Sequence, residues 1–259
     1  MPVGSPTTFA KKSFGALQDY SLLSGRAVGN LFSSPRYWAD IFTQMDSIGA
    51  GSLPIVILTG FFTGCVLALQ SATSLKSFGA ISMTGSLVSL SMVKELGPVL
   101  TGLMVSGRNA SGMASELGSM KVTEQIDAMR ALGTDPIRKL VTPRLVASVF
   151  MLFFLTIVSD AVGIAGGALI SISVLGLNFS SYIHSSYSSL VYGDVVQGLT
   201  KPLFSGFILA TVGCYFGLNT EGGTQGVGRA TTSAVVWSSV FIIIVDFLVS
   251  RLMIGIFGS

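Results

Sequence analysis

Charged residues are scarce in this sequence. Asp, Glu, Lys and Arg make up 10% of its 259 residues, whereas they make up about 25% of an average soluble domain. Half of the residues are hydrophobic, and the mean hydropathy is +0.72. This balance predicts an integral membrane protein and disfavours a soluble domain with one large core. The net charge of +3 is too small to indicate a nucleic-acid partner.

Residues that bind metals or perform catalysis are also few. There is one histidine, His184, and the two cysteines, Cys65 and Cys214, lie in apolar runs without a CxxC or CxxxH neighbour. The sequence has no HExxH, no GxSxG and no GxxxxGK[ST] phosphate loop. The glycines of "GGTQGVGRA" (222–230) lack the preceding strand of a dinucleotide fingerprint, so a tight turn is expected there. We therefore expect a non-catalytic chain with no metal site and no cofactor, which does not bind ATP itself.

Long apolar runs are what the sequence has in abundance. No charged residue occurs over 47–75, and at about 1.5 Å per residue such a helix is long enough to cross a hydrocarbon core of about 30 Å. The sequence predicts an all-α integral membrane protein, with an N-terminal segment over 1–46 and a transmembrane domain over 47–259. Five membrane spans are expected, at about 48–70, 80–107, 145–172, 202–219 and 233–257.

The basic residues predict the orientation of these spans. Short cytoplasmic loops are enriched in Lys and Arg, and eleven such residues lie in 1–46, 108–144 and 220–232. The two other connections contain only Lys76 and Lys201. A cytoplasmic N-terminus is therefore predicted. A cleaved signal peptide is not expected, because no early apolar core is followed by a small-residue cleavage site.

The N-terminal segment and the connection over 173–201 are both expected to carry surface helices. In the first, the apolar residues Phe14, Leu17, Tyr20, Leu23 and Ala27 recur at roughly helical spacing. This pattern is typical of a helix lying in the membrane surface, and the alternative is a solvated leader with a few apolar residues. The second connection is rich in Ser and Tyr.

Glycine pairs at four-residue spacing occur in three spans and allow helix backbones to approach closely. Tight packing within one subunit is favoured over a dimer seam for these pairs. They are Gly60 and Gly64, Gly163 and Gly167, and Gly213 and Gly217.

The second span contains a charged pair inside an apolar run. In "SMVKELGPVLTGLMVSGR" (91–108), Lys94 and Glu95 are adjacent and Pro98 follows. Adjacent helical residues point about 100° apart, so these side chains cannot pair with each other and need different surroundings. Pro98 is expected to free a backbone carbonyl and to bend the helix. The pair either faces a cavity near the polar group of a lipid or fixes helix packing through partners elsewhere.

Two further acids, Asp160 and Asp246, lie within the predicted spans. Partners on other helices are favoured over ion sites for both, although acids inside a membrane begin as functional candidates. Arg251 follows Asp246 at a spacing that permits only an imperfect pair.

The 108–144 connection contains a short amphipathic helix at about 123–132, with Thr123 as its expected cap. This helix either docks into a groove of a cytoplasmic partner or touches only lipid headgroups. Its apolar face contains Val122, Ile126 and Met129, and its charged face contains Glu124, Asp127 and Arg130.

Two stretches of the sequence resemble a known family. The run "KELGPVLTGLMVSGRNASGMASELGSMKVTEQIDAMRALGTDPIRKLVTPR" (94–144) resembles the signature region of the MlaE/YrbE permeases, which are the membrane subunits of ABC-type lipid transporters that work with MCE proteins. The run "GVGRATTSAVVWSSVFIIIVDFLVS" (226–250) resembles the C-terminal region of that family. ELGP, TEQIDAM, LGTDP and GVGRATT in this order are a specific combination, although any one of them alone is weak.

The resemblance implies a homodimeric permease of the bacterial inner membrane. Each subunit would present a coupling helix, 123–132, to an ATPase subunit, with contacts through Glu124, Gln125, Asp127 and Arg130. The lipid pathway would lie between the two subunits and open toward an MCE-domain partner on the far side. The sequence departs from gammaproteobacterial members mainly in its N-terminal leader and over 173–201.

The leading hypothesis is the permease subunit of an ABC transporter of phospholipid or a related lipid. The runner-up is an ion- or proton-coupled secondary transporter of a lipophilic substrate, in which Glu95, Asp160 and Asp246 form a relay; the lack of repeated halves argues against it. A membrane enzyme acting on lipid is disfavoured by the missing nucleophile and metal patterns. Under the leading hypothesis, the residues expected to line the path of the lipid are Leu75, Phe78, Lys94, Glu95 and Pro98.

Overall fold

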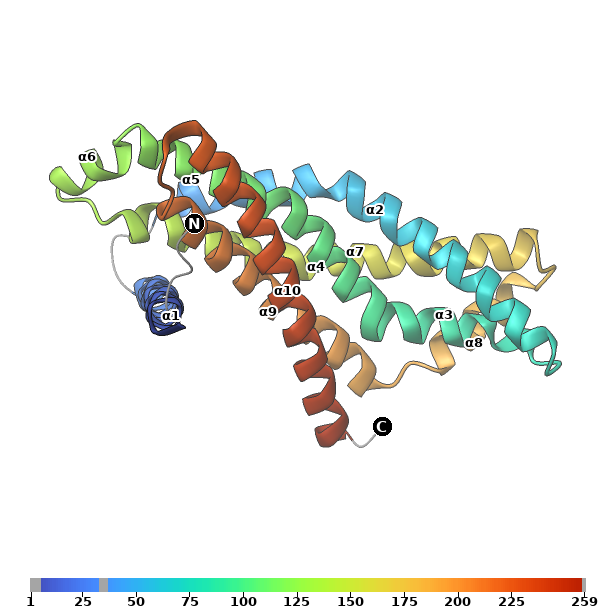
Figure 1. Cartoon of the computed structure of the whole chain (residues 1–259). Coiled ribbons are helices and arrows are strands. Elements are labelled where there is room, and N and C mark those ends of the chain that lie inside the picture. The colour runs from blue at the N-terminus through green and yellow to red at the C-terminus, as the bar shows by residue number, and fades with distance from the viewer. Residues whose placement is uncertain (1–5, 33–36, 258–259) are drawn as a thin grey trace.

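The computed structural model describes residues 6–32 and 37–257, and all regular structure within them is helical. Five helical segments are long and apolar enough to cross a membrane, which confirms the predicted fold class (Figure 1). They extend over Trp38–Lys76, Ile81–Val122, Ile137–Ser173, Tyr192–Leu218 and Gly223–Gly255. In chain order the elements are α1 (Pro6–Gly29), η1 (Asn30–Phe32), α2 (Trp38–Lys76), η2 (Ile81–Met83), α3 (Thr84–Ser91), η3 (Met92–Leu96), α4 (Gly97–Val105), η4 (Ser106–Ala110), α5 (Ser111–Val122), α6 (Gln125–Ala131), η5 (Ile137–Val141), α7 (Thr142–Ser173), α8 (Phe179–Ser188), α9 (Tyr192–Leu218) and α10 (Gly223–Phe257).

The fourth long helix begins well before the predicted span. α9 starts at Tyr192, whereas the apolar run starts after Lys201, and it is this lysine that sets the predicted boundary. The structure instead buries Lys201 within the helix, with 2% of its side chain exposed. Lys201 therefore lies inside this helix and not at its end. It can be buried there because carboxylates of other helices neutralise its charge.

The second span is one continuous helical path with two widened turns. η3 and η4 are π-helical turns that separate α3, α4 and α5. In η3 the Gly97 N–H bonds to the Met92 carbonyl, five residues earlier. A π-turn of this kind adds one residue to the helical ladder and alters which side chains face each neighbour. Pro98, which cannot donate a backbone hydrogen bond, lies two residues after the end of η3.

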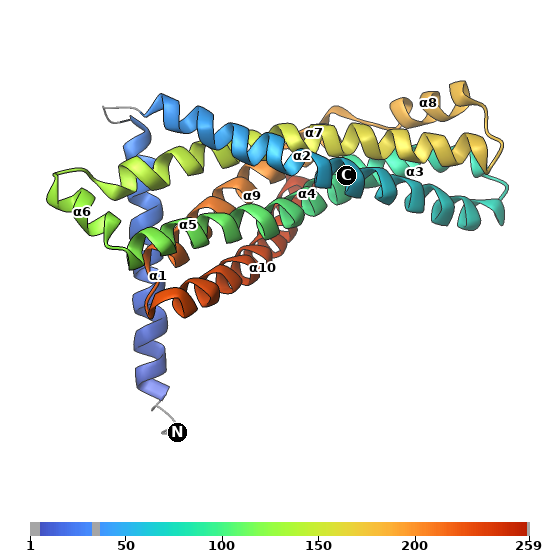
Figure 2. The same ribbon diagram turned by 90° about the horizontal axis from the view of Figure 1, so that it is seen from above.

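α2 and α7 lie side by side along the bundle (Figures 1 and 2). They approach closely at Gly64, where an added Cβ would lie 1.8 Å from the Gly163 carbonyl oxygen. The glycine pairs of all three spans pack against other parts of the same chain, as expected for packing within one subunit. Gly217, for example, lies against Ala114 and Leu117 of α5.

α1 runs crosswise to the long helices (Figure 2). Its Tyr20 hydroxyl hydrogen bonds to Thr211 Oγ1 at 2.8 Å, and Leu23 and Ala27 are buried. Phe14 and Leu17 remain 73% and 63% exposed. The apolar stripe is thus divided between the bundle and the outside, an arrangement suited to a helix in the membrane surface. That location remains a prediction.

α8 supplies the surface helix expected in the 173–201 connection and packs on α3 through serines. Ser86 Oγ donates to the Ser185 carbonyl at 2.9 Å, and Ser89 Oγ donates to the Ser186 carbonyl at 3.0 Å. α1 and α6 lie at one end of the bundle and α8 at the other (Figures 1 and 2). We call these the α6 end and the α8 end.

Candidate functional site

The charged pair of the second span lies in the π-turn η3, and its two side chains have different partners. Lys94 Nζ pairs with Asp194 Oδ1 of α9 at 2.8 Å. Asp194 is 9% exposed at its side chain, and its other oxygen accepts the Val191 N–H at the start of the same helix. The prediction that Lys94 and Glu95 need separate surroundings is therefore confirmed.

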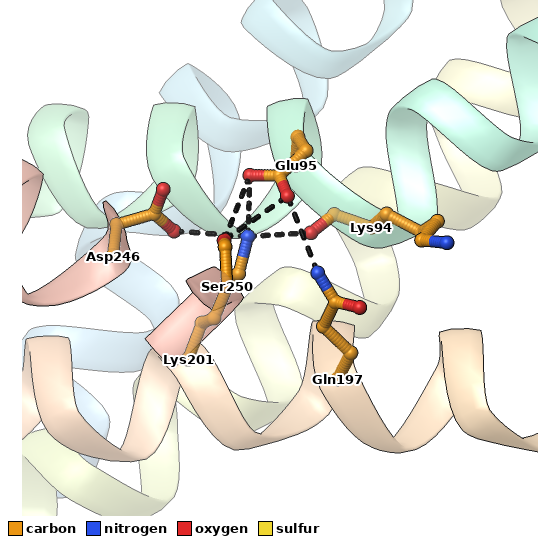
Figure 3. A network of polar contacts seen from close by, with 6 residues as sticks. All are labelled: Lys94, Glu95, Gln197, Lys201, Asp246 and Ser250. Carbon is orange, nitrogen blue, oxygen red and sulfur yellow. Dashed lines mark hydrogen bonds and ion pairs between the residues drawn. The ribbon is translucent and has the colours of Figure 1, made fainter. Parts of the chain in front are cut away.

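Glu95 has a separate set of partners, which belong to α9 and α10 (Figure 3). One of its oxygens, Oε2, is paired with Lys201 Nζ. The other, Oε1, accepts hydrogen bonds from Gln197 Nε2 at 3.3 Å and from Ser250 Oγ at 3.1 Å. Three helical elements are therefore joined by this carboxylate, and charge-assisted bonds of this kind are stronger than neutral ones.

The Lys201 ammonium contacts three acceptors, which match its three N–H groups. Besides Glu95, it donates to the Lys94 carbonyl at 2.7 Å and lies 3.2 Å from Asp246 Oδ1 (Figure 3). The Lys94 carbonyl is four residues before Pro98. In an α-helix it would accept the N–H of residue 98, which proline lacks. The carbonyl that Pro98 was predicted to free is thus used to hold the buried lysine.

Asp246 pairs with Lys201 and makes no ion pair with Arg251 among the described residues. Lys94, Asp194, Glu95, Lys201 and Asp246 together include two cations and three carboxylates. When all are ionised, the group has one negative charge in excess. We call these five residues the ionic cluster.

The ionic cluster reaches the surface through Glu95 and Lys94. Their side chains are 45% and 26% exposed, whereas Lys201 is 2% exposed. The surrounding surface of α10 is apolar, with Ile243, Phe247 and Leu248 all exposed. The structure therefore presents one carboxylate and one ammonium beside an apolar surface, on residues whose positions are fixed by buried partners.

Comparison with known proteins decides the family. The sequence model described as Permease MlaE matches residues 41–252. The chain belongs to the MlaE permease family. It is 42% identical to a probable ABC transporter permease protein of Rickettsia typhi, over 97% of this chain and 96% of that protein.

Other relatives have more specific names. The chain is 33% identical to the intermembrane phospholipid transport system permease protein MlaE of Haemophilus influenzae, over 92% of this chain and 94% of that protein. It is 37% identical to the chloroplastic protein trigalactosyldiacylglycerol 1 of Arabidopsis thaliana, over 88% of this chain and 65% of that protein. The other predicted site residues are therefore described as residues of an MlaE-family permease.

In this MlaE-family chain, α6 (Gln125–Ala131) occupies the segment predicted as the coupling helix. Ile126 is buried, while Glu124, Gln125, Asp127 and Arg130 are exposed. Asp127 accepts from Lys121 at 3.0 Å and from Arg130 at 3.1 Å. These hydrogen bonds, with that of Lys121 as the largest cause, lower the pKa of the Asp127 carboxyl.

The prediction that Thr123 caps this helix is wrong. Thr123 Oγ1 donates back to the Ser119 carbonyl at 2.9 Å and so belongs to the end of α5. The residue before α6 is Glu124, which has a φ of 59°. Left-handed backbone is uncommon outside glycine and tends to occur at functional sites. The exposed Glu124 is thus placed by a strained turn.

The predicted lining residues do not all come together. Lys94, Glu95 and Pro98 lie in or next to η3, with Pro98 buried. Leu75 lies in the last turn of α2, and Phe78, 83% exposed, lies in the turn after it. Helix α3 separates that turn from η3. The structure therefore places Leu75 and Phe78 beyond the start of α3, away from the ionic cluster along the bundle.

The residues of α9 that complete the cluster were not predicted from the sequence. Asp194, Gln197 and Lys201 are spaced at i, i+3 and i+7, which places them on one face of a helix. That spacing is the signal that could have identified them. Lys201 conceals it, because a lysine at the start of an apolar run predicts the end of a loop and not the middle of a helix.

Asp160 also lies inside the bundle, but outside the ionic cluster. It is 8% exposed, and its Oδ1 has no hydrogen-bond partner among the described residues. The same atom lies against Gly97 at the start of α4, where an added Cβ would be 1.7 Å from it. The glycine therefore leaves the space that this carboxyl group fills.

Proposed function

We propose that this chain is the membrane subunit of an ABC transporter that moves phospholipid or a related lipid across or out of the bacterial inner membrane. A separate ATPase subunit would supply the energy, and the chain itself would be non-catalytic. The observation that supports this function best is the ionic cluster, which holds a partly exposed carboxylate and ammonium beside an apolar surface. The name of the Haemophilus influenzae relative agrees with it.

The chemistry of the cluster suits a phospholipid. A zwitterionic or anionic headgroup has a phosphate that Lys94 can attract, and its hydroxyl or ammonium groups can donate to Glu95. The acyl chains would lie along the apolar surface of α10. A second copy of the chain would close this surface into a cavity, with Pro98 shaping the wall and with Leu75 and Phe78 on the path toward the α8 end. There an MCE-domain partner would receive or deliver the lipid.

The exposed residues of α6 would contact the ATPase subunit. Gln125, Asp127 and Arg130 of α6, with Glu124 directly before it, offer both charge signs. The buried Ile126 anchors this helix to the chain. A helix fixed in this way can transmit movement of the ATPase to the spans. In this arrangement the α6 end and the N-terminus face the cytoplasm, as the distribution of basic residues predicts.

The coupling can be tested by reversing one charge. We expect Glu124→Lys to abolish lipid transport in proteoliposomes that contain the chain, its ATPase and its MCE partner, because the contact surface changes sign. The substitution should not change the backbone strain at this position, because Lys and Glu tolerate the left-handed φ of 59° equally poorly. Glu221→Lys is the matched control, as Glu221 is an exposed acid in the connection between α9 and α10, and it should retain transport.

Two results would contradict the proposal. One is normal transport by Glu124→Lys in an assembled complex, which would exclude the coupling role of this residue. The other is lipid movement by the purified chain alone, driven by an imposed proton gradient, which would favour a secondary transporter.

A further inference from the structure

A pocket of about 250 Å³ lies where η1, the start of α2, η5 and the start of α7 meet. It is at the α6 end and shares no residue with the ionic cluster, whose residues belong to η3, α9 and α10. Most of its wall is apolar, formed in part by Leu31, Ile41, Val146 and Phe150. Thr142 Oγ1 contacts the Ala27 carbonyl at 3.4 Å and so joins α7 to the end of α1 beside it.

Two side chains in this apolar wall have unused hydrogen-bond donors. Arg138 Nε and Nη2 are buried and have no acceptor among the described residues. Asn30 Nδ2 is buried and likewise has none there. Buried donors without partners are rare in folded proteins, since each loses its hydration without compensation. Donors from two separate elements that line one pocket point to an acceptor ligand.

The charge around the pocket is positive. No carboxylate lies within 4 Å of Arg138 among the described residues. The neighbouring Lys139 is already paired with Asp40 at 2.5 Å, and its ammonium lies 4.3 Å from the centre of the Tyr37 ring. The acid next to the pocket is therefore neutralised, and the Arg138 guanidinium has no counterion within residues 6–32 and 37–257. An anion would supply both the missing charge and the missing acceptors.

We propose that this pocket binds the phosphate of an anionic phospholipid from the surrounding membrane. Arg138 donates two parallel hydrogen bonds, from Nε and Nη2, to two phosphate oxygens, the fork geometry that guanidinium groups use for phosphate. Asn30 donates to a further phosphate oxygen or to the ester group. The apolar wall at Ile41, Val146 and Phe150 then receives the first carbons of an acyl chain.

The apolar wall is the reason for choosing a lipid over a free phosphate ion. Phe150 and Trp38 are 54% exposed at the edge of the pocket, so the pocket opens toward the outside of helices that cross the membrane. Its volume is below the roughly 300–1,000 Å³ of pockets for drug-sized ligands, which fits a headgroup with the chains extending outward. A bound lipid would join α1 to the first and third spans, independently of any lipid that is transported.

Trp38 provides a direct probe of occupancy. The chain has two tryptophans, and Trp237→Phe leaves Trp38 as the only one. In this background, purified and delipidated protein in detergent is titrated with phosphatidylglycerol whose acyl chains carry bromine, which quenches nearby tryptophan fluorescence. We expect saturable quenching, with at least fivefold weaker binding of the equivalent phosphatidylcholine.

Variants test the two donors. Arg138→Gln should weaken phosphatidylglycerol binding about tenfold, because a charged hydrogen-bonding group is lost. Asn30→Leu should weaken it a few-fold and serves as the second variant if Arg138→Gln fails to fold. Lys76→Gln, which removes the same charge from an exposed position at the α8 end, should leave the affinity unchanged.

Three outcomes would overturn the proposal. Equal affinity of the wild type and both donor variants would show that Arg138 and Asn30 do not bind the lipid. Equal quenching by phosphatidylglycerol and phosphatidylcholine would exclude selection of an anionic headgroup. Complete displacement of the lipid by millimolar inorganic phosphate would assign the pocket to a free anion. None of these results depends on transport or on the ATPase.

Discussion

Replacing Lys201 by Met tests whether the ionic cluster holds the helices together. The substitution keeps the length and the apolar stem of the side chain but removes the ammonium group. It leaves Glu95 and Asp246 without their shared cation, and it leaves the Lys94 carbonyl without its donor. Lys201 and Asp246 are 2% and 15% exposed, so water cannot replace their contact without opening the bundle, whereas Glu95, which is 45% exposed, can still be hydrated.

The expected loss is large. Removal of one partner from a buried ion pair typically costs about 3–5 kcal/mol, because an uncompensated charge remains. Protein stabilities are typically about 5–15 kcal/mol, so this is a substantial part of the total. Equilibrium unfolding of the purified chain in mixed micelles measures it. Lys121→Met is the control, because the pair of Lys121 with Asp127 is exposed and pairs of that kind contribute about 0–1 kcal/mol.

A second substitution separates the cost of the unpaired charge from the cost of altered side-chain packing. When Lys201→Met is combined with Asp246→Asn, the more buried of the two stranded carboxylates becomes neutral, so the double variant should recover about 1–3 kcal/mol relative to Lys201→Met alone. The reasoning would be refuted if Lys201→Met unfolded within about 0.5 kcal/mol of the wild type, since that is the typical range of surface substitutions. It would also fail if Asp246→Asn gave no recovery.

Two more predictions concern single positions in the spans. Asp160→Asn should leave the unfolding free energy unchanged or raise it, because Oδ1 of Asp160 has no partner among the described residues and an unpaired charge is costly there; a loss above about 2 kcal/mol in the same unfolding assay would reveal a partner. Gly64→Ala should prevent α2 and α7 from reaching their observed separation, because its Cβ would lie 1.8 Å from a backbone oxygen. Gly112→Ala, which meets nothing within 4 Å, is the matched change and should be neutral or stabilising by up to about 1 kcal/mol; equal unfolding of the two variants would contradict the close approach.

Much of the candidate site followed from local features of the sequence. The angle between adjacent helical residues was enough to show that Lys94 and Glu95 need different partners. The ring of Pro98 was enough to show that a carbonyl four residues earlier is free. Neither argument could name the partners, because Asp194 and Lys201 are about a hundred residues away in the chain.

The boundaries of α9 and the cap of α6 show why local rules fail at particular residues. A lysine next to an apolar run normally marks the end of a span, since burying an unpaired charge is costly. Lys201 is the exception because Glu95 and Asp246 neutralise it within the bundle. A threonine before a helix is normally its cap, but the tight left-handed turn at Glu124 leaves Thr123 on the preceding helix.

The sequence by itself determined the all-α membrane class, the five spans, the position of the short amphipathic helix and the resemblance to a permease family. These depend on hydropathy and spacing within windows of a few turns, where neighbours in sequence are also neighbours in space. Only the tertiary structure decided that five charged residues of three spans form one cluster, and that Arg138 and Asn30 share a pocket in which no described residue accepts their buried donors. Such groupings depend on how helices distant in the chain are rotated and packed against one another, which local periodicity does not specify.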